Sequence, residues 1–183
     1  MLAEALTALA ALAPGADVVS GCLDAAQRHF NTPPGLVHAI ASVESGGNPR
    51  AVNSVNRNGT VDYGLMQVNS VHLPRLRGIG IDREHLLNPC INAFVGAQIL
   101  ARNLSETGGA VVAALSMYNT GRPDSVIGLN YAQKVLARWQ SGGRLQWTAA
   151  MPGKSFAPSA QAVNVYRAPL MVASNSNPFA PRW

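Results

Sequence analysis

Residues 43–49 read Val-Glu-Ser-Gly-Gly-Asn-Pro, and eighteen positions after Glu44 residues 62–70 read Asp-Tyr-Gly-Leu-Met-Gln-Val-Asn-Ser. Before Glu44, apolar residues recur at the spacing of one helix face, so we predict a helix over 32–44 with Thr32 as its N-cap. The two glycines and Asn-Pro then end the helix, because glycine accepts positive φ and a residue before proline avoids the α region. We therefore expect Glu44 on the last helical turn, where apolar neighbours and the helix dipole favour its neutral, proton-donating form.

A polar run separates the two motifs, and its Asn58-Gly59 pair is typical of a hairpin turn. We predict a small β-hairpin that brings Asp62 and Gln67 back toward Glu44. A proton donor and a second carboxylate on either side of a sugar-binding cleft form the general arrangement of glycoside cleavage. An aspartate at the start of a turn can instead cap the backbone, so Asp62 is only a candidate second carboxylate.

Four sequence blocks carry a resemblance to a known family, and they occur in this order: Glu44-Ser45 with Asn48-Pro49, Gly64-Leu65-Met66-Gln67, Met117-Tyr118-Asn119-Thr120-Gly121, and Tyr131 with Val135. The ordered series resembles the lytic transglycosylases of the lysozyme superfamily, most closely the small ones associated with type III and type IV secretion, conjugation and pilus systems. The resemblance implies an α+β, mainly helical, lysozyme-like fold with a small β-hairpin.

The resemblance also implies an activity, the cleavage of the β-1,4 bond between N-acetylmuramic acid and N-acetylglucosamine in peptidoglycan to give a 1,6-anhydromuramyl product. Glu44 would be the catalytic residue, and Tyr131 would donate its hydroxyl to it. The substrate-binding residues would be Ser45, Gln67, Asn69, Tyr118, Asn119 and Tyr131. Two alternatives stay open: a lysozyme-type hydrolase that uses Glu44 and Asp62, and a non-catalytic peptidoglycan-binding assembly factor.

The chain holds two cysteines, Cys22 and Cys90, and the resemblance implies that they form a disulfide in an oxidising compartment. Two free thiols, or a lipid anchor at Cys22, remain alternatives, since Val-Ser-Gly-Cys over 19–22 resembles a lipobox. No Lys or Arg precedes Arg28, so the basic start of an export leader is missing. We expect an exported, periplasmic protein whose export sequence is weak or absent.

Charge and motif content exclude several function classes. The net charge is +5, but the basic residues are scattered without an aromatic-basic stripe, so we expect no nucleic-acid partner; anionic peptidoglycan glycan strands explain the sign equally well. The four histidines lack ligand spacing and no phosphate-binding glycine loop is present, so we expect no metal and no cofactor. No apolar run near the start is long enough to span a bilayer.

The length of 183 residues and the 48% apolar content fit one globular domain plus an extension, and we expect a monomer. We divide the chain into an N-terminal segment or weak leader (1–18), a lysozyme-like catalytic domain (19–142) and a flexible Pro-rich C-terminal tail (143–183). Residues 141–183 hold five of the twelve prolines and no acidic residue, which is typical of a tail. Its aromatic residues suggest docking on the cleft or on an envelope-spanning secretion or pilus component. Besides 32–44, we predict helices over 22–30, 91–104, 109–118 and 123–140.

Overall fold

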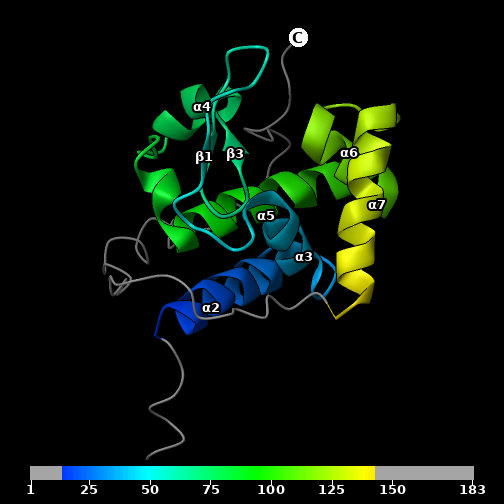
Figure 1. Ribbon diagram of the computed structural model, residues 1–183, viewed down its shortest axis with the longest axis horizontal. Helices are drawn as coiled ribbons and strands as arrows, with labels where there is room; N and C mark the ends of the chain where they lie inside the picture. Colours follow the sequence, from blue (N-terminus) through cyan, green and yellow to red (C-terminus); the bar gives the residue numbers. More distant parts are fainter. Residues whose placement is uncertain (1–13, 143–183) are drawn as a thin grey trace, which may run out of the picture.

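The computed structural model describes residues 14–142, and the predictions for residues 1–13 and for the tail lie outside them. The helices of this part are α2 (Pro14–His29), α3 (Leu36–Ser45), α4 (Leu73–Arg77), α5 (Pro89–Glu106), α6 (Val111–Thr120) and α7 (Val126–Gln140), with 3-10 turns η1 (Ser70–His72) and η2 (His85–Leu87). The strands are β1 (Val52–Asn53), β2 (Asp62–Tyr63) and β3 (Val68–Asn69). The predicted mainly helical α+β class is confirmed (Figure 1). None of these helices is both long enough and apolar enough to cross a membrane.

The predicted hairpin is part of a three-stranded antiparallel sheet in the order β1-β2-β3. Asp62 lies on the central strand, opposite Asn53 on one side and Asn69 on the other. The predicted turn at Asn58-Gly59 is present, since Gly59 has φ of +74° and its N–H donates to Asn56 O at 3.0 Å. The third strand was not predicted, because two residues are too few to show an alternating pattern.

Helix α3 ends as predicted but begins later than predicted. Gly46 takes the left-handed conformation (φ 63°) directly after the helix, so Glu44 lies in the last turn. The first helical residue is Leu36, preceded by Gly35 at φ 81°. The predicted N-cap at Thr32 is wrong, because Thr32 and the residue after it both precede prolines and avoid the α region. The Thr32 hydroxyl is buried without a hydrogen-bond partner among the described residues.

Helix α2 begins eight residues before its predicted start, at Pro14, which suits the first helical position because no N–H is needed there. Helix α5 begins at Pro89, two residues before its predicted start. The Asn88 side chain accepts hydrogen bonds from the N–H groups of Cys90 and Ile91 and so caps the helix. Helices α6 and α7 begin two and three residues later than predicted, at Val111 and Val126.

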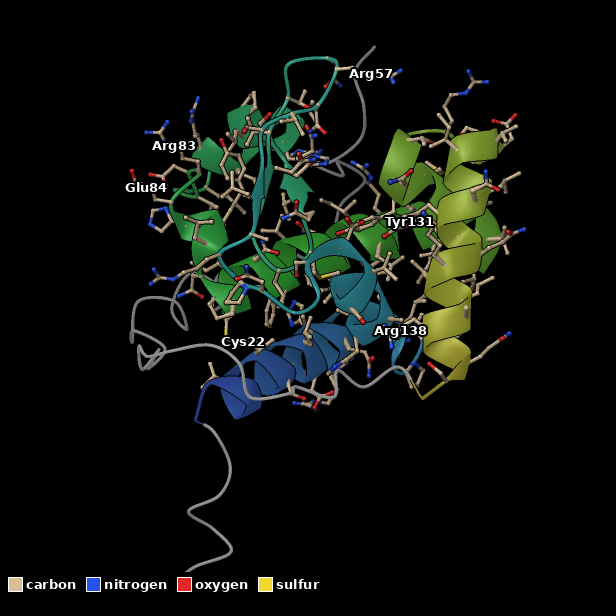
Figure 2. The ribbon with its side chains drawn as sticks, in the orientation of Figure 1. Cys22, Arg57, Arg83, Glu84, Tyr131 and Arg138 are labelled. Carbon is tan, nitrogen blue, oxygen red and sulfur yellow. A yellow bond between two sulfur atoms is a disulfide. The ribbon has the colours of Figure 1, made fainter. Side chains whose placement is uncertain are left out.

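The main core surrounds α3, whose side chains Leu36, Val37 and Ile40 are fully buried among residues of α2, α5, α6 and α7. A disulfide joins Cys22 on α2 to Cys90 on α5, with the Cα atoms 4.6 Å apart (Figure 2). The predicted bridge is confirmed. Both alternatives are excluded in this structure, because neither sulfur is free and the lipid anchor would need the bonded Cys22 sulfur.

Candidate active site

A cleft of about 920 Å³ lies between the sheet and the end of α6. Figure 1 shows the strands and α6 on opposite sides, with α5 crossing between them. The cleft brings together six of the residues that the sequence singled out: Glu44, Asp62, Gln67, Asn69, Tyr118 and Asn119. It also contains residues that the sequence analysis missed, including Asn53, Asn56, Arg57, Thr60, His72 and Arg102.

Glu44 has the environment of a carboxyl group that titrates near neutral pH. The Tyr131 hydroxyl donates to Glu44 Oε1 at 2.6 Å, so the predicted hydrogen bond is present; Figure 2 shows Tyr131 pointing from α7 toward the interior. Burial raises the pKa of Glu44 from 4.5 to about 7. The Tyr131 hydrogen bond lowers this pKa and the charge of Asp62 raises it. Burial, followed by the Glu44 charge, raises the pKa of Tyr131 well above 10, so its hydroxyl remains a donor.

Asp62 is fixed in the cleft by three asparagine side chains. Asn69 Nδ2 donates to Asp62 Oδ1 at 2.6 Å, and Asn56 and Asn53 donate to Oδ2 at 2.8 and 3.2 Å. A carboxylate has about four acceptor positions, so about one remains. The three amide donors therefore hold the Asp62 carboxylate in one orientation at the cleft.

Two of the predicted substrate-binding residues hydrogen-bond to the backbone around the site. The Ser45 hydroxyl donates to Leu65 O at 2.7 Å, and Ser45 is not among the described residues that line the cleft. Gln67 lines the cleft, but its Nε2 donates to Gly64 O at 2.8 Å and to Ala51 O at 3.2 Å. Both side chains therefore tie the turn over 64–67 to its neighbours, Ser45 from the end of α3 and Gln67 from within the turn.

The buried side chain of Asn92 on α5 also hydrogen-bonds to the backbone in and beside this turn. Its Oδ1 accepts from Met66 N at 2.7 Å, and its Nδ2 donates to Tyr63 O at 2.7 Å and to Leu86 O at 2.8 Å. Asn92 has no exposed surface, and two of these three bonds keep buried backbone groups paired. The signal that could have identified it is a polar residue within the largely apolar buried face of α5, which also contains Asn103.

Tyr118 on α6 connects the other wall of the cleft to the same turn. Its hydroxyl donates to Met66 O at 2.9 Å. Burial, followed by the charges of Glu44 and Asp62, raises its pKa well above 10, so it remains a donor. Asn119 is exposed at the cleft, where its side chain is accessible to a ligand.

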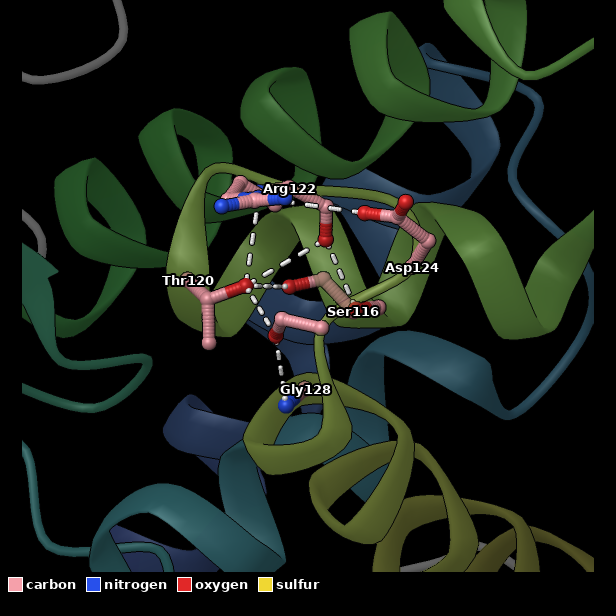
Figure 3. A network of polar contacts seen from close by, with 6 residues as sticks. Ser116, Thr120, Arg122, Asp124 and Gly128 are labelled. Carbon is pink, nitrogen blue, oxygen red and sulfur yellow. Dashed lines mark hydrogen bonds and ion pairs between the residues drawn. The ribbon is translucent and has the colours of Figure 1, made fainter.

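A network of hydrogen bonds joins the end of α6 to the start of α7 (Figure 3). Ser116 Oγ donates to Arg122 O at 2.7 Å, and Thr120 Oγ1 and Ser125 Oγ are hydrogen-bonded at 2.9 Å. Ser125 Oγ also accepts from Gly128 N at 2.9 Å. A Cβ on Gly128 would lie 2.8 Å from the Cα of Ser116, which is too close. This contact holds the cleft end of α6 against α7, the helix that carries Tyr131, whose hydroxyl donates a hydrogen bond to Glu44.

Comparisons with known proteins agree with this geometry. Residues 21–136 match the Transglycosylase SLT domain family. The chain is 38% identical over 132 residues to Invasion protein IagB of Salmonella typhimurium (strain SL1344), covering 70% of this chain and 79% of the relative. It is 42% identical over 101 residues to Protein IpgF of Shigella flexneri, covering 55% and 65%. It is 36% identical over 128 residues to a peptidoglycan-binding-like protein of Escherichia coli O157:H7, covering 63% and 74%. The chain belongs to the transglycosylase SLT domain family and is a peptidoglycan lytic transglycosylase.

Proposed function

We propose that this enzyme cleaves the β-1,4 bond between N-acetylmuramic acid and N-acetylglucosamine and releases a 1,6-anhydromuramyl product. The observation that carries the proposal is Glu44, bonded to Tyr131 in the cleft, with its pKa raised to about 7. Since Oε1 accepts the hydrogen bond from Tyr131, the proton of the neutral acid belongs on Oε2. That oxygen is the donor to the glycosidic oxygen.

Glu44 takes part in two proton transfers in this mechanism: it first donates a proton and then accepts another. Protonation of the glycosidic oxygen breaks its bond to the anomeric carbon, where positive charge develops. Glu44, now a carboxylate, then accepts the proton of the muramyl C6 hydroxyl as that oxygen bonds to the anomeric carbon. The Tyr131 hydrogen bond stabilises the intermediate carboxylate. A group with a pKa near the working pH suits both transfers, and no water is consumed.

Asp62 supplies the fixed negative charge that a positively charged anomeric carbon requires. Its three asparagine partners orient it without neutralising it. The same residue supports the second candidate function, a lysozyme-type hydrolase in which water replaces the C6 hydroxyl and Asp62 acts as the second carboxylate. Anhydro formation is favoured here because the asparagine side chains occupy most of the acceptor positions that a nucleophilic Asp62 would use.

The proposal is tested by the masses of the muropeptides released from purified sacculi. The anhydro product is lighter by one water than the product of hydrolysis. We expect anhydro muropeptides from the wild type and from Glu84→Gln, a control at an exposed glutamate. We expect none from Glu44→Gln. Reducing-end products would establish the hydrolase instead, and sacculus binding without turnover by the wild type would establish the non-catalytic assembly factor.

We further propose that the enzyme works in the cell envelope as a monomer on glycan strands, opening the wall locally for a secretion, conjugation or pilus apparatus. The Cys22–Cys90 disulfide supports an oxidising compartment such as the periplasm. The relatives named above include an invasion protein and a peptidoglycan-binding-like protein. Fractionation of the native host places the protein in the periplasm if this is correct, and recovery of reduced protein from the cytoplasm would contradict it.

A further inference from the structure

A second cavity, of about 310 Å³, adjoins the cleft. Its walls come from the residue that follows α2 and from η1, α4 and α5, and they include Phe30, His72, Arg75, Ile99, Arg102 and Glu106. His72, Ile99 and Arg102 also line the cleft, so the two cavities share a wall. We call the second cavity the arginine pocket.

The arginine pocket is positively charged. Arg75 and Arg102 line it, and Glu106 is the one carboxylate among its lining residues, which leaves a net charge of +1. Arg102 Nε lies 3.4 Å from Glu106 Oε1, yet this buried nitrogen makes no hydrogen bond within residues 14–142. Burial, and then the charges of Arg102 and Arg75, lower the pKa of His72 to about 4, so the imidazole is neutral at pH 7 and the charge resides on the arginines.

The two arginines also act on each other. The pKa of Arg75 is lowered by burial and by the charge of Arg102, so the positive charges are close enough to repel. A bound anion would offset this repulsion. Phe30, Leu76, Val95 and Ile99 supply an apolar wall beside the charged groups. The pocket therefore matches a ligand that combines a carboxylate with small apolar groups.

We propose that the arginine pocket binds the peptide stem that branches from the muramyl sugar, with a stem carboxylate placed between Arg75 and Arg102. This inference rests on the proposed function, because it requires a glycan strand in the cleft. Stem peptides carry both free carboxylates and alanine methyl groups. A sugar chain without stems does not carry this combination. A branch leaving the cleft past His72 and Arg102 enters the pocket directly, since those residues line both cavities.

The first test compares two substrates, glycan strands with intact stems and strands from which an amidase has removed the stems. We expect the wild type to prefer stem-bearing strands in kcat/KM. Arg75→Gln, at a residue that lines the pocket but not the cleft, is expected to reduce this preference about tenfold to a hundredfold through KM, as the loss of one charge-assisted hydrogen bond implies. Arg75→Lys keeps the charge and is expected to retain most of the preference. Arg138→Gln, on the exposed face of α7, is the matched control and should retain all of it (Figure 2).

The second test is independent of turnover. The His72 imidazole is titrated by NMR with and without millimolar free tetrapeptide, L-alanyl-D-glutamyl-meso-diaminopimelyl-D-alanine. A carboxylate bound between the arginines offsets their charge, so the pKa of His72 should rise from about 4. An unchanged His72 titration, or a wild type with no preference for stem-bearing strands, overturns the stem site. A wild type that cleaves neither substrate overturns the proposed function, and the titration then still decides whether the pocket binds the peptide.

Discussion

Replacement of Glu44 by glutamine should abolish activity and stabilise the folded protein at alkaline pH. The pKa of Glu44 is about 7 in the folded protein against its ordinary 4.5, a difference of about 2.5 units. One unit corresponds to about 1.4 kcal/mol, so the ionised side chain destabilises the folded state by up to about 3 kcal/mol at pH 8. Glutamine removes that charge, and its amide oxygen can still accept the hydrogen bond from Tyr131.

The direction in which stability changes with pH follows from proton binding at Glu44. Between pH 4.5 and about 7 the folded protein binds more protons at Glu44 than the unfolded chain does, so stability falls as the pH rises through this interval. Urea unfolding should show Glu44→Gln and wild type within about 1 kcal/mol at pH 4, and the variant more stable by about 2–3 kcal/mol at pH 8. The exposed control Glu84→Gln should stay within about 0.5 kcal/mol of wild type at both values. If Glu44→Gln changed the free energy of unfolding by the same amount at both pH values, ionisation of Glu44 would not be the cause of the difference.

Three further outcomes are expected. Tyr131→Phe removes the hydrogen bond that lowers the pKa of Glu44, so the alkaline limb of the pH–rate profile should move to higher pH. The same change should lower kcat about tenfold. An alkaline limb at an unchanged pH would contradict this role of Tyr131. Cys22→Ser combined with Cys90→Ser opens a loop with a sequence separation of 68 residues and should lower the free energy of unfolding by about 4 kcal/mol, whereas a loss below about 1 kcal/mol would contradict the bridge's contribution. Asn92→Ala removes three hydrogen bonds to backbone groups, two of them buried, and should lower the free energy of unfolding by about 2–4 kcal/mol in urea; a neutral result would show that the turn is held by other contacts.

The fold was predictable from sequence where local chemistry decides it. The glycines after Ser45 end α3 through their backbone angles, as predicted, whereas Asn88 caps α5 two residues before the predicted helix start. The start of α3 was not predicted correctly, because the Thr32 cap pattern gives way to the restriction that two consecutive prolines place on the preceding backbone. The division of the chain at residues 18 and 143 stays a prediction.

The candidate site was predictable only in part. Glu44 and Tyr131 are 87 positions apart, and the family resemblance rather than any local pattern linked them. The asparagines around Asp62 depend on the register of two-residue strands, which no periodicity in the sequence determines. Ser45 lies beside the catalytic residue in sequence, but helix geometry turns its hydroxyl toward Leu65 and away from the cleft. The arginine pocket combines residues of four segments of the chain, so it becomes visible only in the folded chain.

In the proposed reaction Glu44 catalyses cleavage by intramolecular attack of the muramyl C6 hydroxyl, without water. Digestion of sacculi in oxygen-18-labelled water tests this most directly, because only hydrolysis adds a solvent oxygen to the new muramyl end. We expect anhydro products without label from the wild type and no products from Glu44→Gln. One labelled oxygen for each bond cleaved would contradict this reaction and would assign the chemistry to the Glu44–Asp62 pair.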